Sequence, residues 1–226
     1  MEKIPHNKLP QSYENYNYID SPLVEITNDS GIIIDLQYPK LNFKNAINTC
    51  LVRKEILDKL LEAKSYLPEN LTFKVLDAYR PFSLQEELYY AYREQILKEF
   101  NLLDKDKETQ DNFIKNYVSL PKKEENLVPL HATGGAIDLS LVNIQTGEDL
   151  DMGIEFDSFS DLTNTDSFEK ENMDKTIRDN RRILYWAMTK AGFTNLPTEC
   201  WHFDYGNRNW AFYNQKPIIY KAIFEL

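Results

Sequence analysis

Two short segments hold the side chains of this sequence that are best suited to binding a metal ion. In the first, His131 precedes Asp138 by seven residues, and in the second, Glu199 precedes His202 by three. Two imidazoles and one carboxylate form a three-ligand set that leaves one position on a zinc ion open for water, and here a further carboxylate is left over. Together the segments predict a catalytic zinc centre.

Each segment has a simpler interpretation when it is taken alone. Residues seven apart in a regular strand point to opposite faces, so His131 and Asp138 converge only if the chain bends at the glycine pair 134–135. Glu199 reaches the site of His202 only from a bend that precedes a strand. The first pair alone is more typical of a loop histidine beside a capping aspartate, and the second of a hydrogen-bonded histidine in an aromatic strand. Their joint occurrence favours the metal centre.

These residue types suit hydrolysis of an amide bond. Zinc held by neutral imidazoles and a carboxylate lowers the pKa of a bound water to about 7. Glu199 would act as the general base that takes the proton of this water and passes it to the leaving amine. The sequence contains no His-Glu-x-x-His motif, which excludes a thermolysin-like arrangement.

A fixed positive charge would stabilise the oxyanion of the tetrahedral intermediate. Arg80 is the candidate for this role, because it lies between Tyr79 and Pro81 directly after a predicted strand. Taken alone, it is equally typical of a surface arginine at a strand end.

The elements that must position these residues follow from hydrophobic periodicity. Helices are expected over residues 53–66, 83–100 and 173–191, and strands over 31–36, 71–75, 136–142 and 198–205. Ser83 followed by Glu86 predicts a capping box at the start of the second helix. The alternation of apolar and polar residues in 71–75 predicts a strand half exposed to water.

The chain shows neither an internal repeat nor a Gly/Ser-rich linker, so we expect one domain over residues 1–226, with 1–22 as an irregular N-terminal arm. The mixture of helices and strands predicts an α+β fold. We expect a central, mainly antiparallel sheet flanked by helices, with the zinc site in a cleft at the sheet.

Composition excludes several classes of partner. A net charge of −10 disfavours nucleic acid and anionic membrane surfaces, and two cysteines do not make a disulfide framework. The N-terminus lacks the apolar run of a secretory leader, and no later run approaches the roughly 20 apolar residues of a membrane span. We therefore expect a soluble, cytoplasmic protein, or a periplasmic or secreted one if a leader has been removed. The oligomeric state is left open.

Most of the negative charge lies in one segment. Residues 148–174 contain ten acidic side chains and a single base, Lys170. A solvated loop is the simplest interpretation. A calcium loop is not supported, because the sequence around Asp149, Asp151 and Gly153 lacks the third acidic residue and the terminal glutamate of that motif.

Taken together, these residues resemble the zinc D-alanyl-D-alanine dipeptidases of the VanX type, which are related to the D,D-carboxypeptidases of peptidoglycan. The resemblance centres on the pattern Ser-x-His-x-x-Gly-x-Ala-x-Asp followed by Glu-x-x-His, which is matched at 131–138 and 199–202. It extends from about Asp35 to Phe203. The further matching blocks are 35–38 with 42–43, 77–81 and 180–182.

The resemblance implies roles that coincide with those derived from the residues. It implies one Zn²⁺ per chain bound by His131, Asp138 and His202, with Glu199 as general base and Arg80 stabilising the transition state.

The resemblance also implies a use for the acidic segment. There Asp157 would hold the free amino group of the substrate, with Tyr38 beside it. A fixed carboxylate for this ammonium explains a preference for dipeptides over longer chains.

Two positions depart from the family pattern. Pro129 stands in place of a serine and removes a hydroxyl and a backbone N–H, so substrate contacts there are expected to differ. Cys200 stands in place of a bulky aromatic residue, which would loosen the site or admit a larger side chain.

We therefore expect a zinc metallopeptidase that hydrolyses D-alanyl-D-alanine or a close D,D-dipeptide, a small substrate. The alternative is a related peptidoglycan D,D- or L,D-carboxypeptidase or endopeptidase that acts on longer muropeptides. A non-catalytic zinc-containing binding protein is less favoured, because closed structural sites use four protein ligands and only three are evident.

Overall fold

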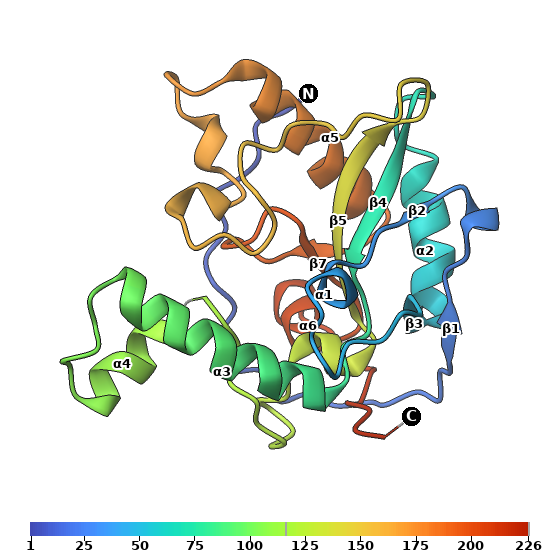
Figure 1. The fold of residues 1–226 in the computed structure, drawn as a ribbon. Helices are drawn as coiled ribbons and strands as arrows, with labels where there is room; N and C mark the ends of the chain where they lie inside the picture. The colour runs from blue at the N-terminus through green and yellow to red at the C-terminus, as the bar shows by residue number, and fades with distance from the viewer. Residues whose placement is uncertain (116, 226) are drawn as a thin grey trace.

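The computed structural model describes residues 1–115 and 117–225, and it contains a central sheet with helices packed around it (Figure 1). The helices are α1 (Gln37–Lys40), α2 (Lys54–Lys64), α3 (Phe82–Glu99), α4 (Lys107–Ile114), α5 (Lys175–Lys190) and α6 (Arg208–Asn214). The strands are β1 (Leu23–Glu25), β2 (Ile33–Ile34), β3 (Leu51–Arg53), β4 (Leu71–Asp77), β5 (Ala136–Asn143), β6 (Thr194–Asn195) and β7 (His202–Asp204). Short 3-10 turns are η1 (Asn28–Ser30), η2 (Leu130–Thr133), η3 (Asp161–Thr163) and η4 (Ser167–Glu169).

The central sheet has five strands in the order β2-β4-β5-β7-β6. The pair β2/β4 is parallel, and the other three pairs are antiparallel. Strands β1 and β3 form a separate antiparallel ribbon. The predicted α+β fold with a mainly antiparallel sheet is therefore confirmed.

One face of this sheet carries the main hydrophobic core. Side chains alternate between the two faces of a strand, and every second residue of β4 and β5 points to the core side. There they meet the apolar stripes of α2 and α5, which pack beside each other. Representative buried members are Phe73, Val75, Ile137, Leu139 and Phe203 from the sheet, and Ile56, Leu60, Leu184 and Met188 from the helices. The other face of the sheet is left for polar residues.

The structure corrects two local expectations. Strand β4 is buried along almost its whole length and is not half exposed, because its polar side chains have partners. The hydroxyl of Thr72 donates to the carbonyl of Gly31, and Lys74 forms ion pairs with Asp35 and Asp149. Helix α3 begins at Phe82 after Pro81 without a side-chain cap, so the predicted capping box at Ser83 is wrong. Proline already supplies a suitable helix start, since it fixes φ.

Strand β7 is also shorter than the strand expected over 198–205, because the chain turns before it reaches His202. The N-terminal arm, residues 1–22, contains neither helix nor strand apart from a bridge between Tyr16 and Ile218. It is nevertheless attached to the domain: Ile4 is buried, and its N–H donates to Glu169. Within the described part of the chain, no helix combines the length and apolarity that crossing a membrane requires.

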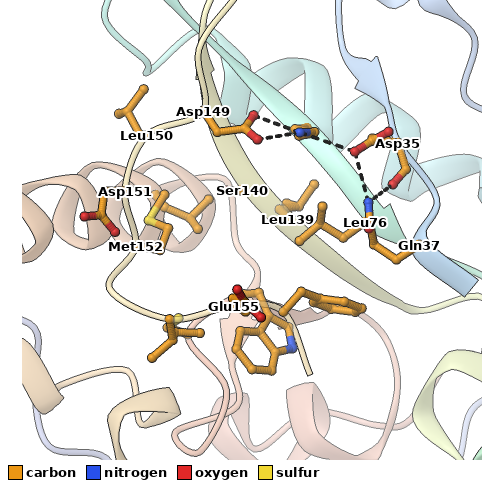
Figure 2. Close-up of a pocket in the computed structure, with 16 residues that line it drawn as sticks. Asp35, Gln37, Leu76, Leu139, Ser140, Asp149, Leu150, Asp151, Met152 and Glu155 are labelled. Carbon is orange, nitrogen blue, oxygen red and sulfur yellow. Dashed lines mark hydrogen bonds and ion pairs between the residues drawn. The ribbon is translucent and has the colours of Figure 1, made fainter. Parts of the chain in front are cut away.

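The acidic segment runs over the polar side of the sheet before it reaches η3 and η4. Figure 2 shows the side chains of Asp149 and Asp35 close to each other. Both carboxylates form ion pairs with the ammonium of Lys74. A cavity of about 420 Å³ lies between this segment and the sheet. The segment is therefore tied to β4 and is not simply a solvated loop.

Arg181 of α5 holds the same segment from the other side. Its guanidinium is only 2% exposed and donates to three carbonyls, those of Met152, Leu162 and Asn164, each at 2.8 Å. It also lies over the ring of Phe168. Replacing it would leave the carbonyls of Met152 and Leu162 without their donor, while that of Asn164 would keep a hydrogen bond from the Ser167 N–H at 3.0 Å.

We predict that Arg181→Met lowers the free energy of unfolding by at least about 2 kcal/mol, since it leaves two carbonyls unsatisfied and each costs about 1–3 kcal/mol. Chemical denaturation followed by circular dichroism measures this. Arg178→Met, on the same helix, is the control and should cost less than about 1 kcal/mol, because Arg178 pairs only with the exposed Asp179. Equal losses in both variants would mean that Arg181 does not hold the segment.

Candidate active site

The site begins with one pair of residues on neighbouring strands. Asp138 of β5 stands directly opposite His202 of β7 in the antiparallel register. Their chain neighbours Ile137 and Phe203 point into the main core, so Asp138 and His202 both point to the opposite, polar face. Asp138 Oδ1 lies 3.0 Å from His202 Nδ1, and the two residues are 1% and 3% exposed. The sheet thus brings two of the predicted ligands into contact.

His131 joins this pair because the chain bends after η2. Gly134 adopts a left-handed conformation, with φ of 70°, which favours glycine over residues with a side chain. Gly135 is required for space, because a Cβ there would lie 2.6 Å from the carbonyl oxygen of Tyr205. The bend leaves His131 Nε2 3.4 Å from Asp138 Oδ2 and 3.2 Å from His202 Nδ1. The bend that the sequence required is therefore present.

Within the described residues, the ligand atoms of these three side chains lie within 4.8 Å of one another. Hydrogen bonds assign the ring protons: His131 Nδ1 donates to the carbonyl of Ala78 at 2.7 Å, and His202 Nε2 donates to Asp204 Oδ1 at 3.0 Å. When both rings are neutral, as metal binding requires, His131 Nε2 and His202 Nδ1 offer lone pairs beside the Asp138 carboxylate. Such a donor set suits a divalent cation.

The charges around Asp138 are consistent with this interpretation. Burial alone would raise the pKa of Asp138, but the imidazoles of His131 and His202 lower it far below its ordinary value. The Asp138 carboxylate is therefore ionised, as metal binding requires.

Arg80 lies in the same buried cluster and not at an exposed strand end. Its Nε donates to Asp77 Oδ2 at 2.9 Å, Nη1 donates to Gln85 Oε1 at 2.8 Å, and Nη2 donates to Tyr38 Oη at 3.0 Å. Nη2 is also 3.9 Å from Asp138 Oδ2. Burial opposes the positive charge, but the surrounding acidic groups raise the pKa of Arg80 above its ordinary value. The guanidinium is thus a fixed cation beside the metal-binding set.

Asp77 owes its position to an irregularity in β4. The register of β4 against β5 shifts between Val75 and Asp77, which places Asp77 opposite Asp138. Without the shift, alternation would turn Asp77 toward the core side. The bulge therefore aims the carboxylate at Arg80.

Asp157 completes a hydrogen-bonded chain that starts at Arg80. Tyr38 accepts from Arg80 and donates to Asp157 Oδ2 at 2.7 Å, and Tyr92 of α3 donates to the same oxygen at 3.0 Å. Asp157 has a φ of 58°, a strained conformation for a residue with a side chain. Burial raises its pKa. Among the described residues, two hydroxyls thus hold one carboxylate oxygen and leave the other available.

Glu199 lies in the turn that precedes β7, as its predicted role required. Its Oε2 is 3.8 Å from His202 Nδ1. Burial, together with the nearby Asp138 and Asp157, raises the pKa of Glu199 to about 7. A carboxyl group with a pKa near neutrality is suited to accept and release a proton.

Two connected cavities meet at these residues. The inner one, of about 50 Å³, is lined by Arg80, the three metal-binding candidates and part of α3. The outer one, of about 310 Å³, is lined mainly by polar residues of the acidic segment. Four residues line both cavities: Tyr92, Tyr117, Asp157 and Glu199. All seven predicted site residues therefore surround the inner cavity.

The sequence reasoning missed four further residues. Gln85 and Tyr92 lie two turns apart on one face of α3, where nothing local distinguishes them from ordinary core residues. Asp77 stands at the start of the 77–81 block, and its type alone did not indicate that it holds Arg80. Asp204 follows His202 by two residues, and this spacing, which puts both on one strand face, was the available signal.

The two departures from the expected pattern, Pro129 and Cys200, do not line the inner cavity. Pro129 stands immediately before η2 and begins that turn. Cys200 lines the cavity beneath the acidic segment and is absent from the lining of the inner cavity. Burial raises the pKa of its thiol to about 11, so it is not an activated nucleophile.

Comparisons with known proteins identify the family of this chain. Residues 39–222 match the Peptidase_M15 family, described as D-ala-D-ala dipeptidase. The chain is 28% identical over 183 residues to the D-alanyl-D-alanine dipeptidase of Synechocystis sp., covering 74% of each chain. It is 27% identical over 156 residues to that of Escherichia coli strain K12, covering 69% of this chain and 66% of the relative.

A solved structure, that of a mutant vancomycin resistance D,D-pentapeptidase VanY in complex with Zn(II), has a TM-score of 0.43 and 12% identity, over 77% of this chain and 85% of that one. The family match covers most of the chain and every site residue but Tyr38, which lies just before it. The predicted family and the predicted class of enzyme, a metallopeptidase, are confirmed: the chain belongs to the D-Ala-D-Ala dipeptidase family.

Proposed function

We propose that this protein is a zinc-dependent dipeptidase that hydrolyses D-alanyl-D-alanine or a close D,D-dipeptide. The observation that carries the proposal is the convergence of His131, Asp138 and His202 with Glu199 and Arg80 on one small cavity. The names of both relatives, which are D-alanyl-D-alanine dipeptidases, support the substrate class.

One zinc ion per chain would be held by His131 Nε2, His202 Nδ1 and the Asp138 carboxylate. When bound, zinc polarises a carbonyl group and lowers the pKa of water. Glu199, at the junction of the two cavities, takes a proton from the attacking water and delivers it to the amine that leaves.

Arg80 supplies a positive charge for the oxyanion that develops on the substrate carbonyl. Its guanidinium is held by Asp77, Gln85 and Tyr38, so it needs little reorientation when negative charge develops on the substrate. Its neighbour Tyr38 links it to Asp157.

Asp157 binds the free ammonium group of the dipeptide through the carboxylate oxygen that Tyr38 and Tyr92 leave available. This contact favours a substrate whose amino terminus is unmodified.

The second candidate is a carboxypeptidase or endopeptidase that acts on longer muropeptides. The outer cavity of about 310 Å³ favours it, since that space would accommodate residues beyond a dipeptide. A non-catalytic zinc protein is less well supported, because the cluster offers three ligands and an adjacent carboxyl group where a closed structural site uses four ligands.

We expect metal-free protein to bind one equivalent of Zn²⁺, as measured by calorimetric titration and by elemental analysis after desalting. Asp138→Ala and His202→Ala should lose the ion, because each removes one of three ligands. Asp149→Asn, which changes an exposed aspartate outside the cluster, should still bind it. Retention of zinc by both ligand variants would contradict the assignment.

Glu199→Gln should lower kcat for D-alanyl-D-alanine by at least about 100-fold while the zinc content stays at one equivalent, because the general base is lost and the ligands are not. Product release followed by a D-alanine assay gives the rate. Glu155→Gln, an exposed glutamate on the acidic segment, is the matched control and should keep its activity. Full activity of Glu199→Gln would remove Glu199 from its proposed role.

Asp157→Asn should lower kcat/KM for D-alanyl-D-alanine by about 10- to 100-fold, the value of a charge-assisted hydrogen bond of about 1.5–3 kcal/mol. It should lower the rate for N-acetyl-D-alanyl-D-alanine far less, so the preference for the free amine falls. Asp161→Asn, in the outer cavity, is the control. If N-acetylation does not slow the unaltered enzyme, the ammonium anchor is wrong and the longer-substrate alternative is favoured.

A further inference from the structure

Asp204 is a fully buried carboxyl group that lies behind His202, on the side away from the other two candidate ligands. It is 0% exposed and follows His202 by two residues on β7, so both side chains point to the same face. Its Oδ1 accepts a hydrogen bond from His202 Nε2 at 3.0 Å. The contact involves the ring nitrogen that points away from Asp138 and His131.

Asp204 is itself held in place by two asparagines. Asn207 Nδ2 donates to Asp204 Oδ1 at 2.5 Å, and Asn209 Nδ2 donates to Oδ2 at 3.1 Å. Both asparagines are buried, at 0% and 5% exposure. A buried carboxylate with both oxygens occupied has little freedom to turn, so its orientation toward His202 is fixed.

Asn207 also connects this carboxylate to the other ligand segment. Its Oδ1 caps α6 by accepting from the backbone N–H groups of Asn209 and Trp210. Its Nδ2 lies 3.2 Å from the carbonyl oxygen of Gly135, in the bend between His131 and Asp138. One asparagine therefore contacts both the bend that aims His131 and the carboxylate behind His202.

We propose that Asp204 is a positioning residue that sets the tautomer and ring orientation of His202. Asn207 fixes Asp204 relative to the 134–135 bend, because its amide group contacts both. The proposal rests on the metal site of the proposed function. A histidine binds a metal ion only through a deprotonated nitrogen, and Asp204 keeps the ring proton on Nε2, away from Nδ1. Asp204 does not contact the substrate cavity, so it acts through His202 alone.

The proposal predicts that Asp204→Asn weakens zinc binding by about 10- to 100-fold, the usual effect of removing such an outer carboxylate. Competition of the protein with a chromophoric chelator for Zn²⁺ gives the dissociation constant. A long-range proton–nitrogen NMR spectrum of the zinc-loaded protein should show the His202 proton on Nε2, and this signal should shift or broaden in the variant. If Asp204 only stabilised the fold, the NMR signal of the His202 ring proton would be the same in the variant and in the unaltered protein.

Two further variants keep the test decisive. Glu169→Gln neutralises another buried carboxylate, one that pairs with Arg182 and does not line the inner cavity, and it should leave zinc affinity unchanged. Asn207→Ser keeps an N-cap oxygen for α6 but removes the amide that reaches Asp204 and Gly135. It should weaken zinc binding in the same direction as Asp204→Asn, and it tests the proposal if Asp204→Asn does not fold.

The outcomes separate this inference from the proposed function. Zinc binding by the unaltered protein, together with unchanged affinity in Asp204→Asn and Asn207→Ser, would overturn the positioning role alone. An equal loss in Glu169→Gln would also overturn it, because the effect would then reflect general destabilisation. Absence of zinc binding by the unaltered protein would overturn both. A loss of zinc affinity in Asp204→Asn and Asn207→Ser, with unchanged affinity in Glu169→Gln, supports the proposal.

Discussion

The antiparallel register between β5 and β7 is the constraint on which the rest of the site depends. It places Asp138 opposite His202 on one face and Ile137 opposite Phe203 on the other. A slip of one residue would exchange the two faces, burying the ligands in the apolar core and exposing the core residues. The hydrophobic core against α2 and α5 therefore stabilises the same register that the proposed metal site requires.

Buried charge explains why so many elements converge on this face. Asp77, Asp138 and Asp157 surround a single guanidinium, that of Arg80, in a region with little access to water. Buried charges are tolerated when they are paired and hydrogen-bonded, and three carboxylates exceed what one arginine neutralises. A divalent cation at the histidine pair would balance the remainder. Each of these groups is positioned by a separate local feature. The β4 bulge positions Asp77, the 134–135 bend positions His131, and the acidic segment carries Asp157.

The periodicity of the sequence predicted the main helices and the central strands, because those elements bury a regular apolar stripe. The prediction failed where a tertiary partner altered the local preference. Strand β4 reads as half exposed, yet Lys74 is covered by ion pairs with Asp35 and Asp149. Ser83 and Glu86 read as a capping box, yet the helix starts one residue earlier, directly after Pro81. The acidic segment reads as solvated, yet Arg181 of a distant helix binds its carbonyls.

The sequence by itself predicted the family and the chemistry that we propose for the site, because the types and spacing of His131, Asp138, Glu199 and His202 together favour a metal centre with a spare carboxylate. It also showed that bends had to precede Asp138 and His202, since a strand alternates its faces. Only the tertiary structure decided the partners that hold these groups, namely Tyr92, Asp77 and Asp204. Hydrogen bonds between distant segments depend on distance and direction in space, and a linear sequence specifies neither until register and packing are complete.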